Sequence, residues 1–299
     1  MKKIILSFFI SIILAGLIFI ALSASAQDLK IAEQNGKYGF VDKKGRFVIK
    51  PTFESLSDFH DGLAAALQGK WGFINKKGEF VIQPQYDKIA DFQEGLAYVV
   101  YETEQRVGQY ESLITSYIAY INKHGKIIIP FYEGGPYFYS FSDGLVAIQE
   151  GDAIYCSYKD KKGKIILDKD YFEKTGWKNT TDAVCHNFSE GLLPVYKYTD
   201  ETYKTRLSAF MNKKGEIVYS KKFVIPDEVE PLCDFDTFSQ GMATFRVNWK
   251  YGFIDKNFKE VIPPIYDFAY EFKDGLSLVE KDEKWFYIDK RGNFIKNKD

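Results

Sequence analysis

Three histidines are the side chains best suited to proton transfer near neutral pH, because the ordinary pKa of imidazole lies near 6.5. They are His60, His124 and His186, and they fall in different parts of the chain. No Gly-x-Ser-x-Gly or His-Glu-x-x-His motif accompanies them, and no glycine-rich phosphate loop leads into a helix. We therefore expect no catalytic residue and a protein that is not an enzyme.

Acidic side chains offer two further kinds of site. In five recurring segments one of them precedes a glycine, at Asp61, Glu94, Asp143, Glu190 and Asp274. Calcium takes about six to eight oxygen ligands, so one carboxylate per segment is too few, and turn formation explains these residues better. We expect no metal and no cofactor. A glycoside hydrolase, which needs two carboxyl groups about 5–10 Å apart, is the least favoured alternative, because acidic residues occur throughout the chain.

Aromatic side chains are the remaining candidates for ligand binding. One set recurs at an equivalent place: Tyr38, Trp71, Tyr251 and Trp285. Their rings could stack on sugars, but packing between repeats, with the following glycine giving room, is the stronger interpretation. A second set lies in longer, irregular segments: Tyr101, Tyr110, Trp177, Tyr198 and Tyr203. These are the candidate ligand-binding residues.

A tight-turn signature occurs seven times along the chain. It begins at Asp42, Asn75, Asn122, Asp160, Asn212, Asp255 and Asp289, and it ends in glycine in every copy except the sixth, which has Phe258. Asp or Asn opens a type I turn with its side chain, and glycine takes the left-handed position that closes it. An aromatic residue precedes each copy, and a β-branched or aromatic run follows it, as in a β-hairpin. The lysine after each Asp or Asn is interpreted as a solvated hairpin residue.

A second signature, Phe-x-x-Gly followed by Leu or Met, alternates with the first. It starts at Phe59, Phe92, Phe141, Phe188, Phe238 and Phe272. One unit is then strand A (63–67), strand B (70–75), strand C (79–82) and a short strand D within about 86–92. Such a meander cannot bury both faces alone, so neighbouring units must stack. We expect an all-β fold of seven repeats, each an antiparallel meander of three or four strands.

The segment Gly69–Pro84, "GKWGFINKKGEFVIQP", with Trp71-Gly72 at its start, resembles the WG repeat of bacterial proteins. The resemblance covers nearly all of residues 29–296 but is weaker in units three to five, where Ile118, Cys156 and Ser208 replace the Trp. It implies a β-rich repeat array, usually in exported or envelope-associated proteins, and no established catalytic residues. A propeller-like ring is slightly favoured over an open β-superhelix, since propeller blades usually have four strands.

The spacings between successive tight turns are 33, 47, 38, 52, 43 and 34 residues. Additional residues fall between strands A and B at 102–115 and 197–206, and between strands C and D at 168–186 and 220–235. In a meander these two kinds of connection lie at the same end of each sheet. Repeat proteins often bind through the face that carries their insertions, so we expect that face to recognise a macromolecule. Packing of these loops over one another is the alternative.

The first 26 residues have the form of an export signal. Lys2 and Lys3 precede an apolar run, and Ala24-Ser25-Ala26 resembles a signal-peptidase site, so we expect cleavage after Ala26. The alternative is an uncleaved membrane anchor, because the run is longer than the usual apolar region of about 7–15 residues. The mature domain spans 27–299, with units at about 29–62, 63–95, 96–144, 145–191, 192–241, 242–275 and 276–299.

Charge and cysteine content limit the partners. The chain has 40 Lys and Arg against 41 Asp and Glu, evenly interspersed, which argues against a nucleic-acid surface. Its 3 cysteines, Cys156, Cys185 and Cys233, allow at most one intramolecular disulfide, and Cys156–Cys185 is one possible pair. We expect a periplasmic or extracellular monomer that binds a protein, with binding of carbohydrate or peptidoglycan as the alternative. No membrane span is expected after signal removal.

Overall fold

The computed structural model describes residues 29–107, 112–133, 139–150, 155–181, 184–202, 204–224 and 235–295. The predicted signal peptide and its cleavage site lie outside these residues, as do Tyr110, Tyr203 and Cys233. Two compact units are present. One contains the residues up to Glu102 together with Tyr120–Ile127, and the other contains Thr103–Ala119 and the residues from Ile128 onward.

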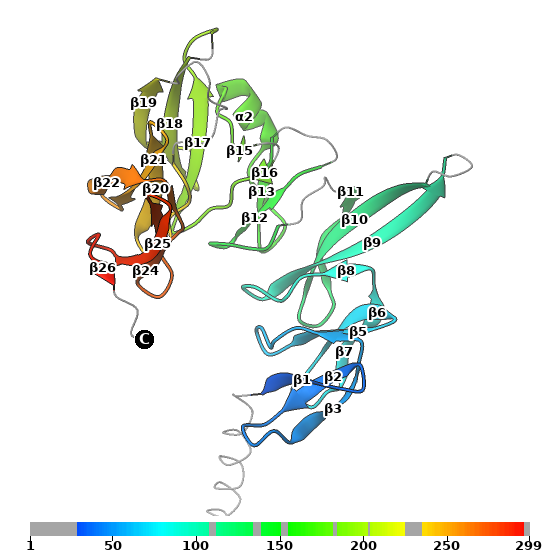
Figure 1. Cartoon of the computed structure of the whole chain (residues 1–299). Helices are drawn as coiled ribbons and strands as arrows, with labels where there is room; N and C mark the ends of the chain where they lie inside the picture. Colours follow the sequence, from blue (N-terminus) through cyan, green and yellow to red (C-terminus); the bar gives the residue numbers. More distant parts are fainter. Residues whose placement is uncertain are drawn as a thin grey trace, which may run out of the picture. The chain divides into compact units, whose positions relative to one another are not determined.

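The predicted all-β fold is confirmed, because small antiparallel sheets account for most of the described residues (Figure 1). The first sheet has β1 (Lys30–Gln34), β2 (Lys37–Val41) and β3 (Phe47–Phe53). The second has β4 (Ser55–Leu56), β5 (Ala64–Gln68), β6 (Lys70–Ile74) and β7 (Phe80–Tyr86). The third has β8 (Lys88–Ile89), β9 (Leu96–Arg106), β10 (Ser112–Asn122) and β11 (Ile127–Glu133).

The later repeats form further sheets of the same kind. One has β12 (Leu145–Ile148), β13 (Ser157–Asp160) and β14 (Ile165–Leu167), and another is the pair β15 (Thr180–Thr181) and β16 (Val184–Cys185). Next come β17 (Leu192–Tyr198), β18 (Thr205–Asn212) and β19 (Ile217–Val224), then β20 (Met242–Val247), β21 (Lys250–Asp255) and β22 (Glu260–Tyr266). The last has β23 (Phe268–Ala269), β24 (Leu276–Lys281), β25 (Lys284–Asp289) and β26 (Phe294–Ile295).

The short strand D belongs to the sheet that follows it. Strand β4 pairs with β5 through Ser55 opposite Leu67, and β23 pairs with β24 through Phe268 opposite Glu280. The second and last sheets therefore have the order D-A-B-C, with D supplied by the preceding sequence repeat. Each such sheet contains chain from two sequence repeats, which links the repeats covalently and through hydrogen bonds.

The tight turns have the predicted conformation. In the second copy, Asn75 Oδ1 accepts hydrogen bonds from the backbone N–H groups of Lys77 at 2.8 Å and Glu79 at 3.1 Å, and Gly78 has φ 81°. In the sixth copy Phe258 adopts the same left-handed conformation, with φ 61°. Its ring compensates by packing, because it stacks on Tyr219 with centroids 4.6 Å apart. Both copies of the turn therefore have the form of a type I turn followed by a residue in the left-handed conformation.

The second signature forms an even tighter hairpin turn. His60 and Leu63 exchange both backbone hydrogen bonds, and the two residues between them, Asp61 and Gly62, have φ 52° and 90°. Positive φ at both central residues is the mark of a type I′ turn, for which Asp-Gly is a favoured pair. The sequence interpretation of these acidic residues as turn residues is confirmed.

The glycine after the recurring aromatic residue is required because the neighbouring strand of the same sheet leaves no room for a side chain. A Cβ atom on Gly72 would lie 2.5 Å from the Ile82 carbonyl oxygen and 2.8 Å from the Pro84 nitrogen. Strand β7 bulges toward strand β6 at this point, because Trp71 pairs with Tyr86 while Phe73 pairs with Ile82. The glycine gives room, as predicted, but the room is taken by the backbone of strand C.

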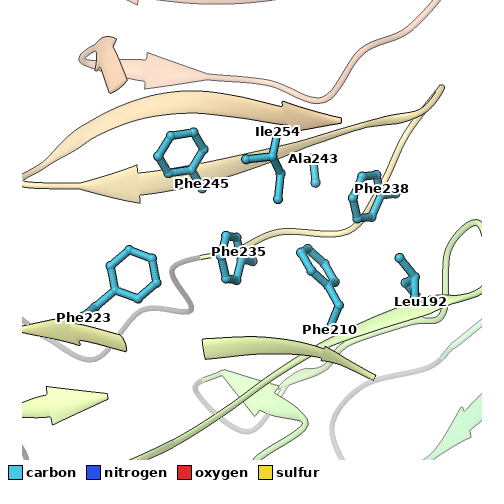
Figure 2. Close-up of a cluster of buried hydrophobic side chains, with 8 residues drawn as sticks. All are labelled: Leu192, Phe210, Phe223, Phe235, Phe238, Ala243, Phe245 and Ile254. Atoms are coloured by element: carbon cyan, nitrogen blue, oxygen red, sulfur yellow. The ribbon is translucent and has the colours of Figure 1, made fainter. Parts of the chain in front are cut away.

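Side chains packed between successive sheets make the cores. In one core, Leu192, Phe210 and Phe223 of the β17-β18-β19 sheet pack with Ala243, Phe245 and Ile254 of β20 and β21 (Figure 2). Phe235 and Phe238 lie between the two sets. This is the stacking that the meander required in order to bury its second face.

A short helix, α2 (Lys169–Thr175), is the one helix among the described residues and was not predicted. Asp168 caps its first turn by accepting a hydrogen bond from the Asp170 N–H, and Gly176 ends it with φ 72°. Its Phe172 is fully buried. No helix in the described part of the chain has the length and hydropathy needed to cross a bilayer.

Candidate functional site

Each sheet has two ends, and we treat them separately. The turn end carries the B–C tight turns and the type I′ turns before strand A. The loop end carries the A–B and C–D connections.

At the turn end, the acidic or amide side chain of one type I′ turn binds the next. Asp61 Oδ2 accepts a hydrogen bond from the backbone N–H of Gly95 at 2.6 Å, and Gln240 Oε1 accepts one from Gly275 at 2.8 Å. Glu190 binds Gly241 at 2.8 Å in the same way, and Asp143 binds Gly191. These side chains therefore tie successive repeats together.

The lysine of the tight turn makes a second contact at this end. Lys123 Nζ donates to the Asp61 carbonyl oxygen at 2.8 Å, Lys256 to that of Glu190 at 2.6 Å, and Lys290 to that of Gln240 at 2.6 Å. Lys213 donates to the Asp143 carbonyl oxygen. The interpretation of these four lysines as simply solvated was wrong. The first central residue of each of these type I′ turns has a backbone carbonyl that the lysine of a later repeat can reach. The lysine ammonium group donates a hydrogen bond to it.

Serine extends the network in the later repeats. Ser142 Oγ donates to the Phe188 carbonyl oxygen at 2.7 Å, Ser189 to that of Phe238 at 2.5 Å, and Ser239 to that of Phe272 at 2.7 Å. The turn end thus joins neighbouring repeats, and much of its hydrogen-bonding capacity serves the scaffold.

At the loop end, an ion pair recurs at the base of strand B. Lys70 Nζ binds Asp87, whose Oδ2 also accepts a hydrogen bond from the Glu102 N–H at 3.1 Å. Lys250 binds Asp267, which accepts one from the Asp282 N–H at 2.9 Å. The lysine hydrogen bond is the main cause that lowers the pKa of Asp87 and of Asp267, and the backbone N–H adds to it.

Two of the predicted ligand-binding aromatics lie at strand β17: Tyr198 is its last residue, and Trp177 lies beside it. Lys178 pairs with Tyr196 in an isolated bridge, which puts Trp177 opposite Lys197. The Lys197 ammonium lies 4.6 Å from the Trp177 ring centroid, and the Lys178 ammonium lies 5.6 Å from that of Tyr198. Trp177 is only 7% exposed, so its ring already serves as a packing surface.

The long connection that contains Trp177 is a folded layer. Asn179 is fully buried, and its amide Nδ2 donates to the Cys156 carbonyl oxygen at 2.8 Å. Cys156 and Cys185 form a disulfide, with Cα atoms 6.0 Å apart, which settles the pairing that the sequence left open. Tyr158 OH donates to the His186 carbonyl oxygen at 2.6 Å. Here the alternative interpretation, packing of the loops, describes the structure.

The other predicted aromatics differ in exposure. Tyr101 is half-buried against Tyr86, at 5.2 Å between ring centroids, and its hydroxyl donates to Gln85 Oε1 at 3.1 Å. Tyr38, Trp71 and Tyr251 are half-buried in their strands. Trp285 stands out, because 48% of its surface is exposed.

Trp285 belongs to a group of mostly exposed aromatic residues that sequence analysis did not assemble. Phe268 lies 5.9 Å from Trp285 and 5.1 Å from Tyr270, while Tyr270 also lies 5.9 Å from Trp285. Tyr251 adds to the group, with its centroid 5.4 Å from that of Phe268. Arg246 lies over the rings of both Tyr251 and Trp249 and so connects Trp249 to the group. We call Trp249, Tyr251, Phe268, Tyr270 and Trp285 the aromatic cluster. A signal for Trp249 was available, since "NWKYGF" at Asn248–Phe253 repeats "NGKYGF" at Asn35–Phe40 with Trp in place of Gly.

A second exposed feature is the insertion in the third repeat. Strands β9 and β10 are 11 residues each, longer than the other strands in the described residues. We call residues 103–107 and 112–117 the arm. Val107, Leu113 and Ile114 are exposed there, Ile114 to 60%. The inserted residues therefore extend the hairpin and present apolar side chains.

The histidines show no catalytic arrangement in the described residues. His60 and His124 are exposed, and His60 Nε2 lies 3.5 Å from Asp91 Oδ2. Burial lowers the pKa of His186. No group of three or more His, Cys, Asp or Glu side chains able to hold a metal ion occurs in the part of the chain that the structure describes.

Solved structures were found that resemble the fold at low sequence identity. A structure described as "Crystal structure of the eukaryotic initiation factor" aligns with a TM-score of 0.55 and 11% identity, over 89% of this chain and 72% of that one. The Hsv2 structure from Kluyveromyces lactis aligns with a TM-score of 0.42 and 10% identity, over 85% of this chain and 86% of that one. The first similarity supports a propeller-like arrangement of small antiparallel sheets. Closure into a ring stays a prediction. No curated protein matches the sequence.

Four segments match the family model described as "WG containing repeat": residues 38–70, 71–102, 119–152 and 251–285. Three of them begin at Tyr38, Trp71 and Tyr251, the recurring aromatic residue that precedes the glycine of the bulged sheets. The third match covers a repeat in which Ala119 replaces that glycine. These four segments are WG repeats, so the resemblance to the WG β-repeat family is confirmed.

Proposed function

We propose that this protein is an exported, non-catalytic repeat scaffold that binds a protein partner through its loop end, with the arm as the main contact. The repeat scaffold itself follows from the family and the fold. The partner, the arm as its site and the export are the proposal.

The observation that carries the proposal is the exposed apolar surface of the arm. Leu113 and Ile114 are neighbours in one strand, so their side chains point to opposite faces, and both are more than half exposed. A two-stranded hairpin is marginally stable by itself. A partner that covers the arm would remove this surface from water, at about 25 cal/mol for each Å² of apolar area.

Two further features support the assignment. Much of the hydrogen bonding at the turn end is between repeats, whereas the long connections that vary between repeats lie at the loop end. The Cys156–Cys185 disulfide suits an oxidising compartment, as does the signal-like N-terminus.

The arm can be tested by replacement with a turn that this protein already uses. Residues 103–115 would be replaced by Asn-Gly, the pair that connects β1 to β2 at Asn35-Gly36, so that Glu102 and Ser116 keep their places opposite each other. A photoreactive amino acid at Tyr117, which is exposed, would trap the partner of the parent protein in living cells. The identified partner would then be purified, and its affinity would be measured for the parent and the trimmed protein.

We expect the trimmed protein to keep its melting temperature and to lose at least about tenfold in affinity, equivalent to about 1.4 kcal/mol. Equal affinity would assign recognition to another surface. Export would be tested by cell fractionation and N-terminal sequencing, for which a first residue of Gln27 is expected. A protein recovered from the cytoplasm with its N-terminus intact would contradict it.

A further inference from the structure

We propose that the aromatic cluster is a saccharide-binding site that stacks the pyranose rings of a neutral polysaccharide. The site is made by β21, β23 and β25 and by the turn before β21. It does not depend on the arm or on a protein partner, so either proposal can fail without the other.

The cluster combines exposed rings from several strands. Phe268, Glu280 and Trp285 lie opposite one another on β23, β24 and β25, so they form one row across a single face of the sheet. Tyr270 continues that face two residues after Phe268. Tyr270 is 51% exposed, and Trp249 is 55% exposed. The result is an aromatic surface on a β-sheet, with polar side chains at its edge.

Trp249 provides an independent observation, because its conformation is unfavourable. Asn248 and Trp249 have φ 49° and 65° and form a two-residue turn, in which the second position is ordinarily glycine. A bulky side chain there is a genuine backbone outlier. Phe258, the other large aromatic with positive φ among the described residues, packs against Tyr219 and Phe238, whereas Trp249 faces solvent beside Arg246. The scaffold gains little from Trp249, which indicates a role in binding.

The second sheet shows that the scaffold does not need these rings. Ser55 and Leu67 occupy the row with Trp71, at the places that Phe268 and Glu280 take with Trp285. Ser57 corresponds to Tyr270, since each donates its backbone N–H to the strand that follows, to Ala65 and Leu278 respectively. The same D-A-B-C skeleton therefore forms with two serines instead of two exposed aromatics.

The polar groups around the rings favour a saccharide. Arg246 lies 5.2 Å from the Trp249 centroid and 5.8 Å from that of Tyr251, so a cation already stacks on both rings, which disfavours a cationic ligand. Glu280 and the Lys250–Asp267 pair alternate with the aromatic side chains. Charged residues are depleted from the centres of protein interfaces. A sugar instead presents C–H faces to rings and hydroxyl groups to carboxylates and guanidinium, as small-ligand sites require.

The test is a titration of the folded full chain with cellohexaose and, separately, with chitohexaose. Tryptophan fluorescence and calorimetry would be recorded. The chain has 4 tryptophans, and ligand stacking should change the emission of the exposed Trp249 and Trp285. We expect Trp249→Gly to weaken binding about two- to tenfold, which corresponds to the worth of one aromatic contact. The pair Phe268→Ser with Tyr270→Ser should weaken it more than tenfold.

Stability measurements distinguish this site from a merely structural cluster. Trp249→Gly restores the residue found at Gly36, so its melting temperature should equal or exceed that of the parent while affinity falls. Trp71→Tyr, which introduces the residue found at Tyr38 and Tyr251, should leave saccharide affinity unchanged.

Failure of both oligosaccharides to bind the parent would overturn the proposal, as would unchanged affinity in the cluster variants or equal loss with Trp71→Tyr. Loss of a protein partner by the cluster variants, without saccharide binding by the parent, would also overturn it. That result would assign the rings to protein recognition.

Discussion

The second sheet and the β17-β18-β19 sheet use the same meander but pair strands B and C differently. In the second sheet, the three residues from Trp71 to Phe73 face the longer stretch from Tyr86 back to Ile82. In the other, Ser208, Ala209 and Phe210 face Lys221, Ser220 and Tyr219 one to one. The bulged sheet has Gly72 and Pro84. The other sheet, which is regular at this position although its register shifts between Phe210 and Met211, has Ala209 and no proline in strand C. Between these two sheets, the glycine and the bulge that contains the proline are therefore present together or absent together.

The fourth repeat extends the comparison. There Ser157 replaces the glycine, and Ser157 Oγ accepts a hydrogen bond from the Lys169 N–H at 3.0 Å, at the start of helix α2. The Cys156–Cys185 disulfide connects the adjacent position of strand B to the strand beyond the helix. Where the repeat sequence has lost its aromatic-glycine pair, other features stabilise the sheet: helix α2, the buried Asn179 and the Cys156–Cys185 disulfide.

Breaking the Cys156–Cys185 disulfide is expected to have the largest effect on stability. Reduction, or the double variant Cys156→Ala with Cys185→Ala, should lower the unfolding free energy by about 3–4 kcal/mol, from the loop entropy of a separation of 29 residues. Denaturant titrations with and without reductant would measure it. Cys233→Ala is the control and should leave the response to reductant unchanged. An unfolding midpoint unaffected by reductant would contradict the role of the bond.

Gly72→Ala should have the next largest effect, about 3 kcal/mol, because its Cβ would overlap backbone atoms of Ile82 and Pro84 that no rotamer change can move. The reverse change in the regular sheet, Ala209→Gly, should cost no more than about 1 kcal/mol. Thermal or denaturant unfolding of both variants would measure the difference. Similar costs would show that the glycine is not coupled to the bulge.

A smaller contrast separates two tight-turn glycines with the same left-handed conformation. A Cβ on Gly78 would lie 2.7 Å from Ile49 Cγ2 of the preceding sheet, whereas one on Gly45 meets nothing within 4 Å. Gly78→Val and Gly45→Val both incur backbone strain, and Gly78→Val should cost about 1–2 kcal/mol more. Lys77→Val controls for the change in turn composition and should be nearly neutral. Identical melting temperatures for the two glycine variants would refute packing between repeats at Gly78.

The smallest effect concerns pH. The pKa of Asp87 is held below its ordinary value of 3.8 in the folded protein, first by Lys70 and then by the Glu102 N–H. Its contribution to stability is therefore present above about pH 4 and is lost as the pH falls through the folded pKa. Asp87→Asn should be slightly less stable than the parent at pH 7, by less than about 1 kcal/mol. It should lose less stability between pH 4 and pH 2. Parallel pH profiles of the two proteins, measured by urea unfolding, would contradict the assignment.

The sequence predicted the features whose causes are local. The Asp or Asn and the glycine of each tight turn act within five residues, and so do the pairs of the type I′ turns, which is why both turns and the strands around them could be predicted. The lysine contacts could not be predicted in the same way. Lys123 reaches Asp61, which belongs to a repeat whose position is known only once the sheets stack.

The candidate sites were less predictable. Trp177 looked like an exposed aromatic in a long loop, but helix α2 and Asn179 turn that loop into a packed layer. The signals for α2 were the capping residues Asp168 and Gly176, because the helix is too short to show a hydrophobic period. The aromatic cluster draws on strands of two neighbouring sheets, so its members could be grouped only by their spatial proximity.

Strand D pairs with the sheet of the following repeat, and this pairing affects how repeat chains of this kind can gain or lose repeats. Duplication of one repeat of sequence, wherever its ends lie within the repeat, adds one strand each of A, B, C and D. Strand D is then still followed by a strand A with which it can pair. A deletion of one repeat does the same in reverse. Among repeats that form the D-A-B-C sheet, strand pairing is therefore kept wherever within the repeat such a duplication or deletion begins, which is not so for a domain whose sheet is complete in itself.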